Sequence, residues 1–229
     1  MNIALCFYGQ PRFYTITHKL YYSKILEEYN PDVFIHTWWS KDMVGLLYPH
    51  AKHVGNALQE EDIIVKQNLI EELTRLYNPT LIEFDDYSTN KIKQYKSNYY
   101  QYYTQYAVKE LLKKYEIQKG IEYDLVIRTR FDLLIKQFVP YNIDDSLWVP
   151  SCCPYNDRYN DLFSFSNSEN YKKLSDTYLN LEEFEKDGKG EMEWAYTSQI
   201  IKKNLEVKKF KAEYETFDIL RSNTAKIYK

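Results

Sequence analysis

Four short apolar runs alternate with helical stretches over the first 135 residues, and this alternation restricts the fold more than any other feature. The predicted strands span residues 2–8, 32–38, 80–84 and 123–132, and the predicted helices between them span residues 14–29, 67–77 and 98–116. The helical stretches repeat apolar residues every three or four positions, whereas the strand runs are short and bounded by Gly, Asn or Pro. Such an order predicts an α/β fold with a mostly parallel central sheet flanked by helices.

The second half of the chain is less regular but continues the mixture of strands and helices. Its predicted elements span residues 147–150, 161–165, 170–185, 191–204 and 205–210. Residues 40–62 show little periodicity, and we expect a long loop there with one short helix at most. A length of 229 residues fits a single domain of this class.

The composition excludes several classes of protein. A net charge of −3 provides no general basic field for duplex nucleic acid, so we expect no nucleic-acid partner. The three cysteines lack any C-x-x-C spacing, which argues against zinc and favours a reducing compartment. There is no signal-peptide pattern and no apolar run of about 20 residues. We therefore expect a cytoplasmic protein without a transmembrane segment, for which peripheral membrane contact stays open.

The run YDLVIRTRFD, residues 123–132, combines a buried strand with charged side chains. Because alternate side chains of a strand share a face, Arg128, Arg130 and Asp132 are expected to point the same way. Two guanidiniums beside one carboxylate suit a diphosphate accompanied by a divalent cation. A structural Arg–Asp ion pair is the alternative interpretation.

The segment GQPR ends the first predicted strand and offers a second set of candidates. Gly9 permits close approach of a ligand to the backbone, Gln10 can bind a base edge or a ribose, and Arg12 can meet a phosphate. Ligands of open α/β sheets bind at the carboxyl ends of the strands, where this segment and Arg128–Asp132 both fall. The alternative is an ordinary turn with a surface arginine.

Three further residues are candidates on less specific grounds. His36 ends the second predicted strand, either as a ligand contact or as a hydrogen-bonded structural residue. Asp161 and Glu193 are candidates for a general base that takes a proton from an acceptor hydroxyl. Glu193 also fits a purely structural role, since an acidic residue in the first turn of a helix interacts well with the helix dipole.

An ordered set of segments resembles a known family. The segments are IALCFYGQPR, NPDVFIHTWW, SNYYQYYTQYAVKELLKKYE, YDLVIRTRFDL and NDLFSFSNSENY. In this order, across residues 1–205, they are similar to small glycosyltransferase-like proteins of bacterial polysaccharide loci and large DNA viruses. The resemblance implies a GT-A-like nucleotide-diphosphosugar transferase fold and transfer of a sugar from a nucleotide donor. Residues 1–135 would form the nucleotide-binding half of one domain, and residues 136–229 its acceptor-side half.

The resemblance also assigns roles on the donor side. By position, Phe7, Tyr8, Gly9 and Arg12 would border the nucleotide. His36 is added as a donor-side candidate from its place at the end of the second predicted strand alone. The donor would be a UDP-, GDP- or dTDP-sugar, and the acceptor a glycan, glycolipid or glycoprotein.

The expected metal site departs from the family pattern. Arg128 and Arg130 would lie near the diphosphate, and Asp132 would stand where the D-x-D motif of GT-A enzymes binds Mn²⁺ or Mg²⁺. The earlier acidic position of that motif is Arg130 here, so one carboxylate remains. The arginines would then replace part of the cation's charge.

The predicted activity is that of a glycosyltransferase, and a retaining mechanism stays open beside an inverting one. Two alternatives also stay open: a non-catalytic module of the same fold that binds nucleotides or glycans, and another α/β transferase such as a nucleotidyltransferase.

Overall fold

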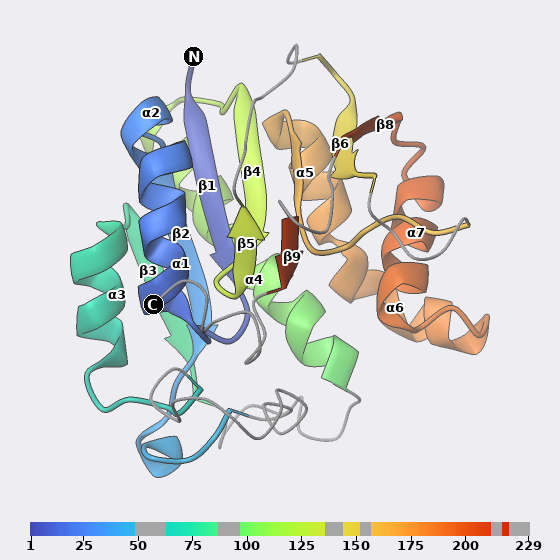
Figure 1. Ribbon diagram of the computed structural model, residues 1–229. Coiled ribbons are helices and arrows are strands. Elements are labelled where there is room, and N and C mark those ends of the chain that lie inside the picture. Colours follow the sequence, from blue (N-terminus) through green and yellow to red (C-terminus); the bar gives the residue numbers. More distant parts are fainter. Residues whose placement is uncertain (49–62, 87–96, 136–143, 152–156, 212–216, 220–229) are drawn as a thin grey trace.

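The computed structural model describes residues 1–48, 63–86, 97–135, 144–151, 157–211 and 217–219, and it has an α/β architecture around one large sheet (Figure 1). Seven strands form this sheet. Across the sheet they are β3 (Leu81–Asp85), β2 (Asp32–Trp38), β1 (Ile3–Tyr8), β4 (Leu125–Arg130), β7 (Ser164–Ser166), β6 (Leu147–Pro150) and β8 (Val207–Phe210). The first four are parallel, β7 runs antiparallel to both neighbours, and β8 is parallel to β6.

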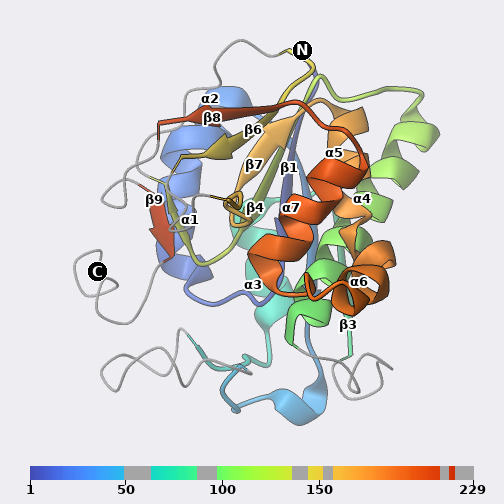
Figure 2. The same ribbon diagram turned by 90° about the vertical axis from the view of Figure 1, so that its right-hand side faces the viewer.

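Helices cover both faces of the sheet. In chain order the helical elements are α1 (Tyr14–Tyr21), the π-helical η1 (Tyr22–Leu26), α2 (Glu27–Tyr29), the 3₁₀ turn η2 (Lys41–Met43), α3 (Leu69–Tyr77), α4 (Ser97–Lys119), α5 (Ser168–Ser175), α6 (Thr177–Lys186) and α7 (Met192–Lys202). Figure 2 shows α1 and α4 on opposite sides of the sheet. A small antiparallel pair, β5 (Leu133–Ile135) with β9 (Phe217–Ile219), lies beside α1.

The central strand β1 explains why both faces are covered. All six of its residues are buried, so neither face is left for water. Leu5 and Phe7 belong to the core beneath α1 and α3, whereas Cys6 and Tyr8 belong to the core beneath α4 and α5. The even spacing of these side chains follows from the two-residue period of a strand.

The predicted α/β class with a mostly parallel sheet is confirmed. The predicted strands at 32–38 and 147–150 have the observed bounds, and the helix predicted at 98–116 is α4. The helix predicted at 14–29 forms, but it contains the π-helical segment η1.

Other predicted elements differ from the structure. The strand predicted at 123–132 ends at Arg130, and a turn separates it from β5. The helix predicted at 170–185 is divided into α5 and α6 at Asp176. The strand predicted at 161–165 forms only over Ser164–Ser166, because the carbonyl of Asp161 bonds to the side chains of Tyr8 and Arg128 instead of to a neighbouring strand.

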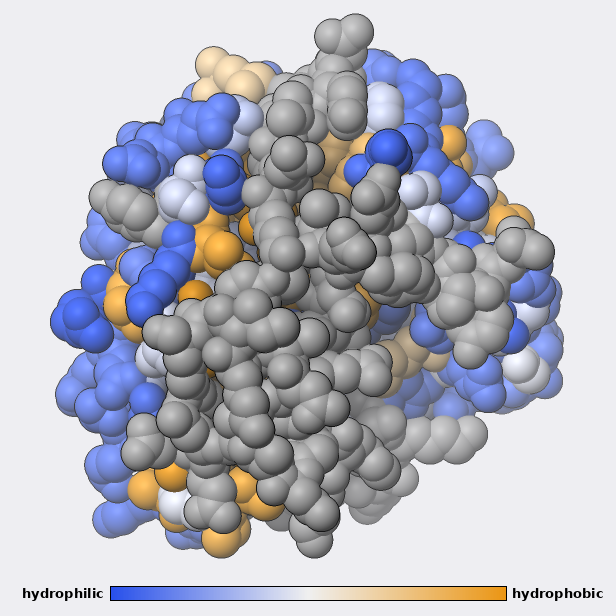
Figure 3. Space-filling model, in the orientation of Figure 1, coloured by the Kyte–Doolittle hydropathy of each residue, from blue (hydrophilic) through white to orange (hydrophobic). Residues whose placement is uncertain are grey.

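One sheet joins the two halves of the sequence, since β4 pairs with β7 across that division. On the face shown in Figure 3, the described surface is mainly hydrophilic with scattered hydrophobic patches. Within the described ranges, no helix is both long and apolar enough to cross a bilayer. The predicted loop at 40–62 begins with η2, while residues 49–62 lie outside the described residues.

Candidate functional site

The strand order has a topological switch point between β1 and β4. After β1 the chain adds β2 and β3 on one side, and it then returns to add β4 on the other side of β1. The segments that leave β1 and β4 both turn towards α1. Open α/β sheets bind ligands at such a switch point, beyond the carboxyl ends of the strands. The segment Gly9–Arg12 follows β1, and Phe131–Asp132 follows β4. Both predicted motifs meet at this point.

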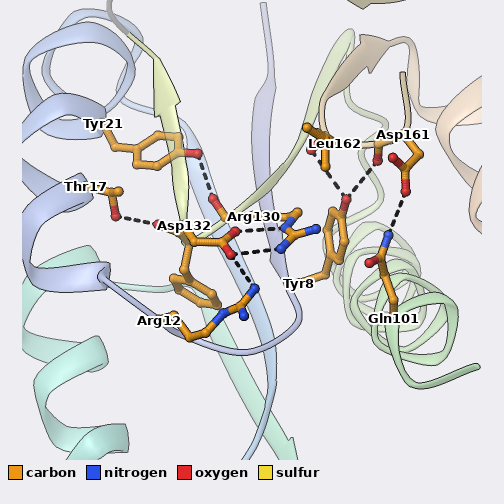
Figure 4. Close-up of polar contacts among 10 residues, drawn as sticks. Tyr8, Arg12, Thr17, Tyr21, Gln101, Arg130, Asp132, Asp161 and Leu162 are labelled. Atoms are coloured by element: carbon orange, nitrogen blue, oxygen red, sulfur yellow. Dashed lines mark hydrogen bonds and ion pairs between the residues drawn. The ribbon is translucent and has the colours of Figure 1, made fainter. Parts of the chain in front are cut away.

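Arg12, Asp132 and Arg130 form a charged cluster at the switch point, here called the edge cluster (Figure 4). Nε and Nη2 of Arg130 donate to Oδ1 and Oδ2 of Asp132, both at 2.8 Å. Nη2 of Arg12 donates to Oδ2 of the same carboxylate at 2.6 Å. One carboxylate thus holds two guanidiniums, although Arg12 and Asp132 are 120 residues apart in sequence.

Helix α1 fixes the backbone on which the edge cluster stands. Thr17 Oγ1 donates to the carbonyl of Phe131 at 2.5 Å, and the Tyr21 hydroxyl donates to the carbonyl of Arg130 at 2.8 Å. The ring of Phe131 is buried and stacks on Phe7, with 4.9 Å between the centroids. The turn after β4 is therefore anchored by hydrogen bonds to its backbone and by packing of the side chain between the two charged residues.

The edge cluster keeps its carboxylate ionised. Burial of Asp132 works to raise the pKa of its carboxyl group, but the charges of Arg130 and Arg12 outweigh burial and hold this pKa below its ordinary value. Arg130 is largely buried, with its side chain 15% exposed, which works to lower its pKa, yet Asp132 keeps the pKa of this guanidinium above the ordinary value. Asp132 and Arg130 are consequently charged at neutral pH.

Arg128 shares a strand face with Arg130, as predicted, but lies deeper and does not join the edge cluster. Its side chain is fully buried and donates to Ser164 Oγ at 3.0 Å, to Gln105 Oε1 at 2.6 Å and to the Asp161 carbonyl at 2.6 Å. The rings of Tyr8 and Tyr196 lie 5.3 and 4.7 Å from its guanidinium carbon. These contacts tie α4, α7 and the segment before β7 to the sheet, so Arg128 holds the core together.

The residues predicted to border a nucleotide divide into two groups. Phe7 and Tyr8 are buried in opposite core layers, and the Tyr8 hydroxyl donates to the Asp161 carbonyl at 3.0 Å. Gly9 has a φ of +90°, and a Cβ added there would meet no atom of the described residues within 4 Å. Space is therefore left above Gly9, next to the half-buried Gln10 and close in sequence to Arg12.

His36 lies away from the edge cluster, at the ends of β2 and β3. Its Nε2 is 3.4 Å from Oδ2 of Asp85, and its ring lies edge-on to Tyr103 with 5.8 Å between the centroids. The contact with His36 is the main reason why the pKa of Asp85 is lowered. His36 is buried, so this geometry favours the structural interpretation of that residue over a ligand contact.

The two candidate bases, Asp161 and Glu193, are near each other. Asp161 is buried, and its Oδ2 accepts from Nε2 of Gln101 at 2.8 Å. Glu193 is half-buried in the first turn of α7, where burial and then the charge of Asp161 raise its pKa. The charge of Asp161 also raises the pKa of Arg130, so Asp161 interacts electrostatically with both Glu193 and the edge cluster.

Gln101 was not predicted as part of a site. It lies within the tyrosine-rich start of α4, where no spacing distinguishes it from its neighbours. Beside Glu193, an open pocket of about 520 Å³ is lined by residues that include Asn98, Gly190 and Glu191. The face of the Trp194 ring is covered by Arg158, whose guanidinium carbon is 4.4 Å from the ring centroid.

The residues at Asp132 do not fit a bound divalent cation. Both carboxylate oxygens already accept hydrogen bonds from guanidiniums at 2.6–2.8 Å, which leaves two positive charges where the cation would need further oxygen ligands. Within the described ranges, no group of three or more His, Cys, Asp or Glu side chains is placed to hold a metal. The expectation of Mn²⁺ or Mg²⁺ on Asp132 therefore finds no support in the chemistry of its neighbours.

Comparison with known proteins gives a family. The model of the family described as Domain of unknown function (DUF7796) matches residues 1–220. This span includes the whole seven-stranded sheet, the edge cluster and both candidate bases. No curated protein matches the chain.

Proposed function

We propose that this chain, which belongs to the DUF7796 family, is a glycosyltransferase of GT-A-like fold that takes its sugar from a nucleoside-diphosphate donor. One observation carries the proposal: the edge cluster brings the two separately predicted motifs together at the switch point of a mostly parallel sheet. A doubly charged guanidinium pair at this point suits a diphosphate. The resemblance described above supplies the sugar-transfer chemistry.

On the donor side, the edge cluster would stabilise the leaving group. When the bond between the sugar and the diphosphate breaks, negative charge grows on the bridging oxygen and remains on the released nucleoside diphosphate. Fixed guanidiniums lower the energy of that charge because they need no reorganisation as it develops. Arg12 and Arg130 are held by Asp132 and by the anchored turn before it, which makes them suitable donors.

On the acceptor side, Glu193 is the better candidate for the general base. Its pKa is raised towards the working pH, and it borders the open pocket beside α7. In an inverting reaction, the acceptor oxygen would form a bond to the anomeric carbon while the nucleoside diphosphate leaves, and the hydroxyl proton would pass to Glu193. Asp161 is buried and bound to Gln101, so it would help to position Glu193 and would not take the proton itself.

The test is release of nucleoside diphosphate from a panel of UDP-, GDP- and dTDP-sugars, with and without simple glycan acceptors. We expect one donor class to be turned over, and Glu193→Gln to reduce the rate about 10²- to 10⁴-fold. Glu182→Gln, an exposed position on α6, is the matched control and should keep the rate. Equal rates for both variants would remove Glu193 from the mechanism, and no release from any donor would contradict a transferase.

A second candidate function, a non-catalytic nucleotide-binding module, is favoured by the closure of the edge cluster. The Asp132 side chain is only 2% exposed and its charge is already compensated by two arginines. Calorimetry separates the two functions, because a module would bind a nucleoside diphosphate tightly and release none from any donor. Release of pyrophosphate instead would indicate a nucleotidyltransferase.

A further inference from the structure

The edge cluster has more hydrogen-bond donors than partners. Arg12 donates to Asp132 through Nη2 alone, and within the described residues its Nε and Nη1 make no hydrogen bond. Arg130 uses Nε and Nη2 on Asp132, which leaves Nη1 without a bond in the same part of the chain. A guanidinium has five N–H groups, so both arginines keep donors for another acceptor.

One of these unpaired donors, Nε of Arg12, is buried. The Arg12 and Arg130 side chains are only 14% and 15% exposed, and Nε of Arg12 is buried. A buried N–H without a partner is unfavourable, and the great majority of such groups in folded proteins are paired. The buried Nε of Arg12, which has no partner within the described residues, therefore points to an acceptor supplied by a ligand.

The charge of the edge cluster selects an anion. Two guanidiniums and one carboxylate leave one net positive charge, and the lowered pKa of Asp132 keeps that balance at neutral pH. A divalent cation would add to this positive charge and would compete with both arginines for the same carboxylate oxygens. A diphosphate would instead bring its own negative charge and several acceptor oxygens, which match the forked geometry of arginine.

We propose that the diphosphate of a nucleoside-diphosphate ligand binds directly to Arg12 and Arg130 without a bridging metal ion, and that Asp132 is a positioning residue that holds the two guanidiniums in place. This inference rests on the proposed function for the identity of the ligand. It goes beyond that function by assigning the phosphate contacts and by removing the cation from them.

The test is calorimetry of the full chain with UDP, GDP and dTDP, first in EDTA and then in Mn²⁺ or Mg²⁺. We expect the diphosphate that binds to do so with the same dissociation constant, within about 2-fold, in both conditions. Arg12→Gln should weaken binding about 10-fold or more, since a charged hydrogen-bond donor is lost. Arg130→Lys keeps the charge but loses the fork, and should also weaken binding measurably.

Controls separate binding from folding. Arg75→Gln removes an exposed arginine from α3 and should leave the dissociation constant unchanged. Thermal unfolding of each variant establishes that the protein titrated is folded, and the corresponding nucleoside, without phosphate, should bind far more weakly than the diphosphate.

The outcomes distinguish this inference from the proposed function. Loss of diphosphate binding in EDTA, or unchanged binding by a folded Arg12→Gln variant, would overturn metal-free binding even if sugar transfer were observed with Mn²⁺. Metal-free binding that depends on Arg12, without release from any sugar donor, would support this inference while contradicting the transferase. Absence of binding by all three diphosphates in both conditions would overturn the inference outright.

Discussion

Arg128 and Arg130 stand two residues apart on the same face of β4, yet their surroundings are opposite. Arg128 lies in the interior, where its guanidinium donates to Ser164, Gln105 and a main-chain carbonyl. Arg130 lies at the end of the strand and pairs with a carboxylate that also holds Arg12. The same residue type in the same register therefore serves the core in one position and the ligand edge in the other.

The difference teaches that depth along the strand, and not the face alone, decides what an arginine does. At Arg128 the neighbours are polar but neutral, apart from the nearby charge of Asp161, and aromatic rings cover the guanidinium. At Arg130 a donor remains without a partner within the described residues. We expect mutations to separate the two positions clearly, and the predictions below are ordered by the expected loss of free energy of unfolding.

The largest loss is expected for Arg128→Met. The substitution leaves the acceptors of Gln105 and the Asp161 carbonyl buried without their charged donor, and we expect a loss of about 3–5 kcal/mol. Urea unfolding followed by circular dichroism measures it. Arg130→Met is the matched comparison, with an expected loss below about 2 kcal/mol because the carboxylate keeps Arg12. Similar losses at the two positions would abolish the distinction between core and edge.

Asp132→Asn comes second and tests the edge cluster. It removes the charge that holds two guanidiniums, and we expect a loss of about 1–3 kcal/mol at pH 7. The folded-state pKa of Asp132 is lowered, so the ionised carboxylate stabilises the fold above the unfolded value of about 4. This contribution is lost as the pH falls through the folded-state pKa.

Unfolding of the wild type and of Asp132→Asn between pH 7 and pH 3 provides the measurement. The difference in stability between the two proteins should shrink as the medium becomes more acidic than about pH 4. A difference that stays constant over this range would mean that the charge of Asp132 contributes nothing and that only its shape matters.

The edge cluster also shows how far sequence patterns reach. Alternation placed Arg128 and Arg130 on one face, and the rule for carboxyl ends of parallel strands brought Arg12 to the same edge as Asp132. Both rules depend on local periodicity, which the apolar runs make unambiguous. Depth was not predictable, because it depends on which helices pack over β4, and that is set by residues far away in the chain.

Three other features could not be predicted from the sequence, for related reasons. The contact between Gln101 and Asp161 joins α4 to the segment before β7, and neither residue belongs to a pattern that marks it. Strand β9 has three residues, too few for any periodicity to identify it. The separation of α5 from α6 at Asp176 was also missed, because the apolar spacing of the helix continues through this point.

Thr17→Val, third in the order, removes a hydrogen bond to the turn after β4 and leaves the contacts of Arg128 in the core intact. The hydroxyl of Thr17 donates to the carbonyl of Phe131, the residue between Arg130 and Asp132 of the edge cluster. Its loss should cost about 1 kcal/mol and should weaken nucleoside-diphosphate binding more than it weakens the core. Thr74→Val, on an exposed position of α3 where the hydroxyl bonds only within the helix, is the control. Equal effects on binding would show that α1 does not organise the edge.

The smallest effect on stability, with a large one on activity, is expected for Glu193→Gln. Burial and the charge of Asp161 raise the pKa of Glu193, so the folded state binds the proton more tightly than the unfolded chain does. The wild type therefore gains stability as the pH falls through the folded-state pKa. At neutral pH, ionised Glu193 slightly lowers the stability of the folded protein.

The glutamine variant should accordingly be as stable as the wild type at pH 7, or more stable by less than about 1 kcal/mol, because solvent screens this half-buried group. Its stability should also lose the rise that the wild type shows as the pH falls from 7 towards the ordinary glutamate pKa of about 4.5. Parallel urea titrations at these pH values measure both effects. A clear destabilisation at pH 7 would mean that ionised Glu193 supports the start of α7, as an ordinary acidic residue of a first helical turn does, and is not held ready to accept a proton.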